Sequence, residues 1–152
     1  MIKIRDYLAE NRIIDLKATT KIDALEELIE GIGSDNAIAD REKFFKAVVT
    51  REKVMSTGVG DGIAIPHARI SQVKNPFVAL GRAKQGIEYG SSDGKPVNLV
   101  ILIGASEKQT SLYLQLLSRT LSLFVDSAMR AKILKAASPR EIRETLTATE
   151  SD

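Results

Sequence analysis

The sequence feature that most constrains the fold is the run V-N-L-V-I-L-I at residues 97–103. Apart from Asn98 the run is apolar without alternation, and it lies between turn-forming residues. A strand with one wet face alternates polar and apolar side chains, whereas a strand covered on both faces is almost continuously apolar. We therefore expect residues 97–104 to form a strand with a layer of helices on each face of its sheet.

Two further strands are predicted upstream of this run. Residues 76–83 form a second short apolar run, separated from the first by the turn-rich segment Y-G-S-S-D-G-K-P. The alternation over residues 63–65 predicts a shorter strand that leads into the only histidine of the chain, His67. The middle of the chain is thus expected to supply the sheet.

Helical periodicity appears before these strands. Thr20, followed by Asp23, resembles a helix N-cap, and apolar residues then recur at helical spacing until Gly31 and Gly33, which are expected to end the helix. Asp40 is expected to cap a second helix, which extends to about Arg51.

Helical periodicity returns after the strands. One apolar stripe covers residues 110–124, Asp126 is expected to cap a helix extending to Ala137, and S-P-R-E at 138–141 is a specific helix start. Residues after Leu146 are expected to fray. The order of elements predicts an α/β fold with helices covering a central sheet. With no linker or repeat in the sequence, we expect one domain over residues 1–152.

Composition excludes several kinds of site and partner. The 22 Lys and Arg residues nearly balance the 20 Asp and Glu residues, so no strong field favours nucleic acid. There is no cysteine and a single histidine, which argues against a structural metal site, and no cofactor is expected. The charged N-terminus does not resemble a signal peptide, and the longest apolar stretch is too short to span a bilayer. We expect a cytoplasmic protein without membrane insertion.

The segment S-T-G-V-G-D-G-I-A-I-P-H-A-R-I at 56–70 carries the candidate chemistry. Its three alternating glycines, Gly58, Gly60 and Gly62, permit either a tight turn or a concavity of backbone amides that binds an anion. Pro66 restricts the backbone before His67 and so holds the ring on a stiff stem. Taken alone, a single histidine at a strand end is more often a surface residue.

The stretch R-E-K-V-M-S-T-G-V-G-D-G-I-A-I-P-H-A at 51–68 resembles the active-site signature of phosphotransferase-system enzyme IIA domains of the fructose, mannitol and nitrogen type. Gly86-Ile87 and Pro96-Val97 extend the resemblance over almost the whole chain. The resemblance implies a central mixed β-sheet with helices on both faces. It also implies a phosphotransferase acting as a phosphocarrier: His67 accepts a phosphoryl group from HPr or an HPr-like protein. The group then passes to an enzyme IIB, or its presence regulates a target protein.

The resemblance also assigns roles around His67. Arg51, sixteen residues before it, matches the family's arginine and is expected to stabilise phosphate, although it could also complete a helix end. Ser56, Thr57 and the Gly58 amide are candidate phosphate donors, and local turn hydrogen bonds are the alternative for Ser56 and Thr57.

The helix expected over residues 110–124, after the buried strand, differs from the family at one position. Many relatives place a second histidine near its start, where this chain has Tyr113. The Tyr113 hydroxyl is a candidate phosphate donor, with packing against the loop as the alternative. Of the other charged residues near the motif, Glu52 and Asp61 are expected to be solvated, and Arg69 to lie on the surface.

Three functions remain to be compared. The leading hypothesis is the phosphocarrier, and the absence of an attached IIB or membrane segment fits either a sugar-system IIA or a nitrogen-regulatory one. The alternative is a non-catalytic regulatory module that docks on a transporter, a kinase or a transcription regulator. Nucleotide binding ranks third, because G-V-G-D-G lacks both the dinucleotide fingerprint spacing and a Walker lysine.

Overall fold

The computed structural model describes residues 2–32 and 37–150. The N-terminal part contains two 3₁₀ helices, one strand and two helices: η1 (Ile4–Asp6), η2 (Glu10–Arg12), β1 (Ile13–Asp15), α1 (Lys21–Gly31) and α2 (Arg41–Val54). Five strands follow: β2 (Gly58–Gly60), β3 (Ile63–Ala64), β4 (His67–Arg69), β5 (Phe77–Ile87) and β6 (Val97–Ala105). Three helices complete the described chain: α3 (Thr110–Phe124), α4 (Ser127–Lys135) and α5 (Pro139–Thr149).

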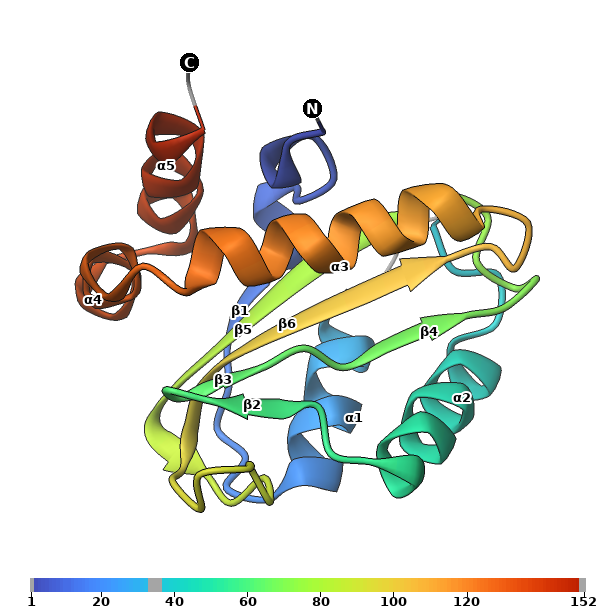
Figure 1. Cartoon of the computed structure of the whole chain (residues 1–152), viewed down its shortest axis with the longest axis horizontal. Coiled ribbons are helices and arrows are strands. Elements are labelled where there is room, and N and C mark those ends of the chain that lie inside the picture. Colours follow the sequence, from blue (N-terminus) through green and yellow to red (C-terminus); the bar gives the residue numbers. More distant parts are fainter. Residues whose placement is uncertain (1, 33–36, 151–152) are drawn as a thin grey trace.

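The long strands β5 and β6 form the antiparallel centre of a mixed sheet (Figure 1). Within the described residues the order is β1-β5-β6-β3-β2, with β1 parallel to β5 and β2 antiparallel to β3. The short strands β3 and β4 follow one another along the same edge of β6, both parallel to it. The chain between them therefore interrupts one line of pairing, and His67 begins β4 at that interruption.

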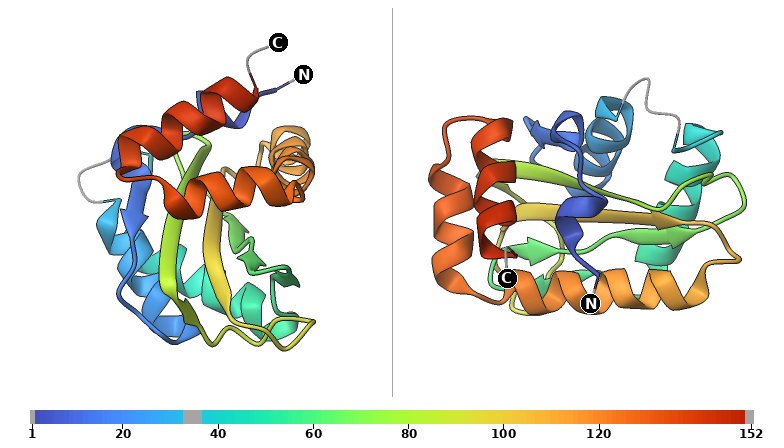
Figure 2. Two further views of the ribbon diagram at one scale, coloured as in Figure 1. Left: turned by 90° about the vertical axis from the view of Figure 1, so that its left-hand side faces the viewer. Right: turned by 90° about the horizontal axis from the view of Figure 1, so that it is seen from above.

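Helices cover both faces of the sheet, as the continuous apolar run predicts. Helices α1 and α2 lie on one face and α3 on the other, while α4 and α5 lie together toward one end (Figures 1 and 2). Two apolar clusters fill the layers: one joins α1 and α2 to the sheet, and the other joins α3, α4, α5 and η1 to it. Every residue of β6 except Asn98 is buried. The predicted α/β fold is confirmed.

Most of the predicted helix starts are confirmed by their hydrogen bonds. The side chains of Asp40, Asp126 and Ser138 each accept from backbone N–H groups in the first turn of the helix that follows. Thr20 is the N-cap residue of α1, as predicted, but its side chain makes no capping hydrogen bond. The Glu27 carboxylate instead accepts from the backbone N–H groups of residues 17 and 18 just before the helix.

The predicted helix end at Gly31 is confirmed, whereas the prediction for the end of α5 is wrong. Gly31 is the last residue of α1, and an added Cβ there would lie 2.2 Å from Cδ1 of Ile14, so close packing explains the glycine. The predicted role of Gly33 falls outside the described residues. The expected fraying after Leu146 is wrong: α5 continues to Thr149, and the buried Glu150 accepts from the backbone N–H groups of Ile4 and Arg5. Figure 2 shows η1 beside α5, which this pairing explains.

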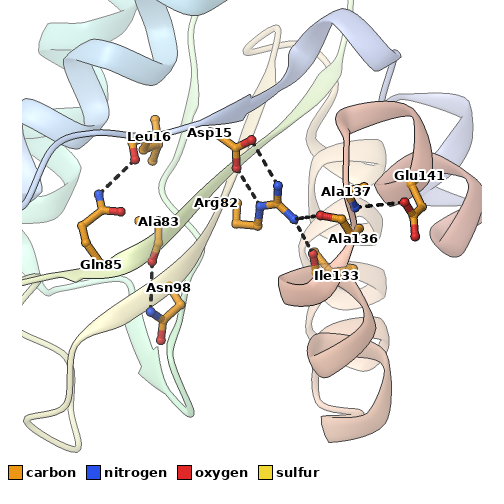
Figure 3. A network of polar contacts seen from close by, with 10 residues as sticks. All are labelled: Asp15, Leu16, Arg82, Ala83, Gln85, Asn98, Ile133, Ala136, Ala137 and Glu141. Carbon is orange, nitrogen blue, oxygen red and sulfur yellow. Dashed lines mark hydrogen bonds and ion pairs between the residues drawn. The ribbon is translucent and has the colours of Figure 1, made fainter.

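A buried guanidinium ties the β1 edge of the sheet to α4 (Figure 3). Arg82, on β5, forms a two-point ion pair with Asp15, with Nε–Oδ1 at 2.6 Å and Nη2–Oδ2 at 3.1 Å. Its Nη1 also donates to the carbonyls of Ile133 and Ala136 at the end of α4. This hydrogen bonding lowers the pKa of Asp15. The network satisfies two carbonyls at the C-terminal end of α4 and joins that helix to the side of the sheet opposite to β4.

Within residues 2–32 and 37–150, none of the helices combines the length and apolar character needed to cross a membrane.

Candidate functional site

The position of His67 is set by the interruption between β3 and β4. Backbone bonds on both sides of Pro66 hold this segment: Ile65 N donates to Thr57 O at 3.0 Å, and Ile103 N donates to Pro66 O at 3.0 Å. Because proline has no N–H and a fixed φ, the chain leaves the ladder there without an unpaired donor. His67 then pairs in register with Ile103 on the central strand. The stiff stem predicted for the ring is thus anchored to the central strand β6.

One ring nitrogen of His67 is held by the backbone two residues before it. His67 Nδ1 lies 2.7 Å from the Ile65 carbonyl oxygen. A carbonyl only accepts, so Nδ1 carries the proton and Nε2 presents its lone pair to the surroundings. Partial burial lowers the pKa of His67, the bond to Ile65 opposes this effect, and the charge of Arg51 lowers the pKa further. The imidazole is therefore neutral and nucleophilic near pH 7.

His67 opens onto a shallow pocket of about 260 Å³. Residues from α2, from β4 with the residue after it, and from the start of α3 line it: Ala47, Arg51, His67, Ala68, Arg69, Ile70 and Tyr113. Larger hollows lie along α3 and between α1 and α2, but the only imidazole of the chain is here. The structure thus brings together three of the predicted site residues, namely His67, Arg51 and Tyr113.

Arg51 lies in the last turn of α2, where it contacts the helix end and also lines the pocket. Its Nη1 donates to the carbonyl of Met55 just beyond the helix at 2.9 Å, and its side chain lines the pocket of His67. In the part of the chain that the structure describes, it forms no ion pair with a carboxylate. A guanidinium without a neutralising partner is well suited to phosphate oxygens.

Tyr113 contacts the ring of His67 from α3. The two ring centroids are 5.7 Å apart at an interplanar angle of 61°, an edge-to-face arrangement. Burial raises the pKa of Tyr113, and the charges of Arg51 and Arg69 act against this rise. The tyrosine therefore stays protonated near pH 7 and can donate a hydrogen bond. The packing considered for this residue and its place in the pocket are both present.

The side chains of Ser56 and Thr57 form local and buried contacts outside this pocket. Ser56 Oγ accepts from Gly58 N at 3.1 Å, which is the turn hydrogen bond considered as the alternative. The Thr57 hydroxyl donates to Glu52 and lies 3.0 Å from the Tyr89 hydroxyl. Neither side chain is among the residues that line the pocket, and the Gly58 amide is already paired with Ser56. These three candidate donors therefore do not line the pocket of His67 and are engaged in other contacts.

Glu52 is buried, so the expectation that it is solvated is wrong. Only 6% of the residue is exposed, and its carboxylate accepts from the N–H and O–H groups of Thr57 and pairs with Lys21 at 3.2 Å. Burial raises the pKa of Tyr89, which keeps its hydroxyl protonated beside Thr57. The Thr57 carbonyl accepts a hydrogen bond from Ile65 N, and the Ile65 carbonyl accepts one from His67 Nδ1. The buried network around Glu52 is therefore connected to the imidazole.

The alternating glycines form a tight turn. Gly60 and Gly62 have φ angles of 100° and 78° at the connection between β2 and β3, on either side of Asp61 at 57°. Gly58 serves close packing instead, because an added Cβ would lie 2.4 Å from Ser91 Oγ. Asp61 is exposed, as expected. The turn interpretation thus accounts for Gly60 and Gly62, and none of the three glycines lines the pocket of His67.

Arg69 is a charged residue of the pocket that the sequence did not lead us to expect there. It is exposed, as expected of a surface residue, yet it lines the same pocket as His67. The signal was available: residues two apart on a strand point to the same face, and Ala68 between them is buried. Among the described residues no group of three His, Asp or Glu side chains could hold a metal ion.

Comparisons with known proteins point to one family. A family model described as phosphoenolpyruvate-dependent sugar phosphotransferase system, EIIA 2, matches residues 7–149. The chain is 36% identical over 138 residues to the fructose-specific EIIABC component of the phosphotransferase system of Bacillus subtilis (strain 168). That match covers 90% of this chain but only 22% of the length of that relative.

Two solved structures are similar over nearly their whole length. Nitrogen regulatory protein IIA-Ntr from Neisseria meningitidis has a TM-score of 0.86 at 30% identity, covering 95% of this chain and 99% of that one. Enzyme IIAMTL in its complex with phosphorylated enzyme IIBMTL, from Escherichia coli, has a TM-score of 0.77 at 24% identity. It covers 92% of this chain and 96% of that chain, and the likeness concerns the fold alone.

Proposed function

Because the chain belongs to the EIIA 2 family of the phosphoenolpyruvate-dependent sugar phosphotransferase system, we propose that it is a cytoplasmic phosphocarrier with His67 as acceptor. In this proposal residues 1–152 act as one domain, of which the family model matches residues 7–149. Transfer on to an enzyme IIB serves sugar uptake, whereas a regulatory role uses the phosphorylation state itself. Relatives of both kinds occur among the similar proteins.

The observation that carries the proposal is the neutral imidazole of His67 in a pocket with a guanidinium that has no acidic partner among the described residues. The hydrogen bond to Ile65 fixes the tautomer, so that the Nε2 lone pair is free to attack phosphorus. Phosphoryl transfer depends mainly on in-line positioning and on stabilising the charge of the phosphoryl oxygens. Arg51 supplies that charge, and the Tyr113 hydroxyl supplies a further donor.

The transfer step follows from this tautomer. The Nε2 lone pair of His67 forms a bond to phosphorus while the P–N bond of the donor phosphohistidine breaks, and that electron pair returns to the donor ring. A donor ring protonated on its other nitrogen leaves as neutral imidazole. The product ring keeps its proton on Nδ1, which donates a hydrogen bond to the Ile65 carbonyl, so protons and charge balance. The reverse exchange with an acceptor protein follows the same course.

The partners in this proposal are proteins. The donor is the phosphohistidine of HPr or an HPr-like carrier, as in the family. The acceptor is an enzyme IIB or a regulated target protein; a complex of a IIA with a phosphorylated IIB has been solved for the structurally similar enzyme IIAMTL. No residue of the proposed site requires a cofactor.

The proposal is tested by labelling. The protein is incubated with phosphoenolpyruvate, enzyme I and the HPr-like protein of its own organism, and protein-bound phosphate is assayed for acid lability and base stability. We expect such label in the wild type and none in His67→Ala. Arg51→Gln is expected to slow labelling about 100-fold, as for loss of one transition-state donor, while the control Arg140→Gln, exposed on α5, does not.

Three results would contradict parts of this proposal. Absence of label in the wild type, or label that persists in His67→Ala, removes the carrier function. Unchanged labelling of Arg51→Gln returns Arg51 to its helix-end role. Label that appears on His67 but passes to no enzyme IIB, together with binding of a target that depends on the label, favours the regulatory module over the sugar carrier.

A further inference from the structure

Arg69 is a second cation in the His67 pocket that the proposed function leaves without a task. It occupies the third residue of β4, and Ala68 between it and His67 faces the apolar core. Two residues of strand rise by roughly 6.6 Å, so both side chains leave the same face at a spacing that a phosphoryl group can bridge. The same pocket contains Arg51 from α2.

The guanidinium of Arg69 is held in place by the start of α3. Its Nη1 donates to the carbonyl of Glu107 at 3.3 Å and also to the hydroxyl of Thr110. Its Cζ lies 5.6 Å from the ring centroid of Tyr113, a cation–π distance. These contacts use one nitrogen and one face of the group, so the remaining N–H donors stay available on a pre-oriented fork.

The charge of Arg69 is not neutralised within residues 2–32 and 37–150. No carboxylate of this part of the chain pairs with it, and its effect reaches the pocket, since it opposes the rise of the Tyr113 pKa. Tyr113 therefore lies between His67 and Arg69. Its ring contacts the His67 ring edge-to-face, and the Arg69 guanidinium lies over it.

We propose that Arg69 is a second phosphate-binding residue, which contacts the phosphoryl group on His67 from the α3 side while Arg51 contacts it from the α2 side. Tyr113 positions Arg69 as an aromatic platform, in addition to any bond from its hydroxyl. The inference rests on the proposed phosphocarrier function and deepens it. It also gives the tyrosine at this position a task that needs no second imidazole.

The test compares variants with two phosphoryl donors. The donors are the phosphorylated HPr-like protein and phosphoramidate, a small P–N compound that has no protein surface to dock. We expect Arg69→Gln to slow labelling of His67 about 10- to 100-fold with both donors, as for loss of a charge-assisted hydrogen bond. Arg69→Lys, which keeps the charge without the fork, is expected to fall in between. The control is Arg140→Gln, an exposed arginine paired with Glu144 on α5.

A second pair of variants tests the platform. Tyr113→Phe keeps the ring and loses the hydroxyl, whereas Tyr113→Leu loses both, so the leucine variant is expected to be slower. Equal rates for these two variants overturn the platform role. Circular dichroism melting checks that all variants fold.

The outcomes separate this inference from the function on which it rests. An unlabelled wild type rejects the phosphocarrier function itself. With a labelled wild type, an Arg69→Gln rate equal to that of Arg140→Gln overturns the inference alone. Slowing that appears only with the protein donor also overturns it, because Arg69 then serves docking rather than phosphate binding.

Discussion

Replacement of Glu52 by leucine tests the buried support behind His67. The substitution removes the acceptor of the Thr57 N–H group and the partner of Lys21, at a site where 6% of the residue is exposed. A buried N–H group left unpaired costs about 1–3 kcal/mol, and breaking a buried ion pair costs about 3–5 kcal/mol. The Thr57 hydroxyl can still bond Tyr89, and Lys21 is partly exposed. We therefore expect the free energy of unfolding to fall by about 3 kcal/mol.

Urea unfolding followed by circular dichroism measures this loss. For a domain of this size it corresponds to a fall in Tm of about 6–12 °C. Glu42→Leu is the matched control on the same helix, because Glu42 is exposed and forms a surface pair with Lys46, so its loss should stay within about 1 kcal/mol. Glu52→Gln retains one carbonyl acceptor and is expected to lie between the two. If Glu52→Leu proves as stable as Glu42→Leu, the buried network does not support this region as described.

Two further predictions concern the histidine and the loop before it. NMR titration of the single imidazole, His67, is expected to give a titration midpoint below pH 6.5 in the folded protein and about 6.5 in urea. Arg51→Gln should raise the midpoint of the folded protein, because the charge of Arg51 lowers the pKa of His67. The unfolded chain then binds more protons between the two midpoints, so this contribution to stability is present above pH 6.5 and is lost as pH falls through the folded midpoint; a folded midpoint at or above 6.5 contradicts it. Gly58→Ala places a Cβ 2.4 Å from Ser91 Oγ and should lower the free energy of unfolding by about 1–3 kcal/mol in urea unfolding, with partial recovery in a Ser91→Ala background. A loss below about 0.5 kcal/mol would show that the two backbones are not held this close.

The layers of the fold were predictable because a strand covered on both faces must consist almost entirely of apolar residues. The apolar run 97–103 identified a central strand, since each of its faces must meet a helix layer. The edge strands β1, β2 and β4 were not predicted, because three-residue strands leave almost no periodic signal. The prediction for the end of α5 was wrong for a related reason. Its stability comes from Glu150 bonding to η1 at the other end of the sequence, which no local pattern reveals.

The candidate site was predicted where a motif fixes local geometry and missed where geometry depends on tertiary contacts. The family signature pointed to His67 and Arg51, which the structure brings into one pocket. Ser56 and Thr57 lie near His67 in sequence, but the bend of the chain directs their side chains into a turn and into the interior. The signature also includes Glu52, whose burial depends on Lys21 and Tyr89 from distant segments.

The adjacent residues Arg51 and Glu52 point in different directions from the same helical turn. Consecutive side chains on a helix point about 100° apart, so Arg51 reaches the open pocket while Glu52 reaches the interior. From Glu52 a continuous series of hydrogen bonds passes through Thr57 and Ile65 to His67 Nδ1. The guanidinium of Arg51 and the imidazole of His67, the proposed phosphate contact and phosphoryl acceptor, are therefore both connected to the same end of α2. Since the proposed transfer depends on His67 attacking phosphorus in line while Arg51 contacts the phosphoryl oxygens, a shift of α2 relative to β6 should impair it even with every proposed site residue intact.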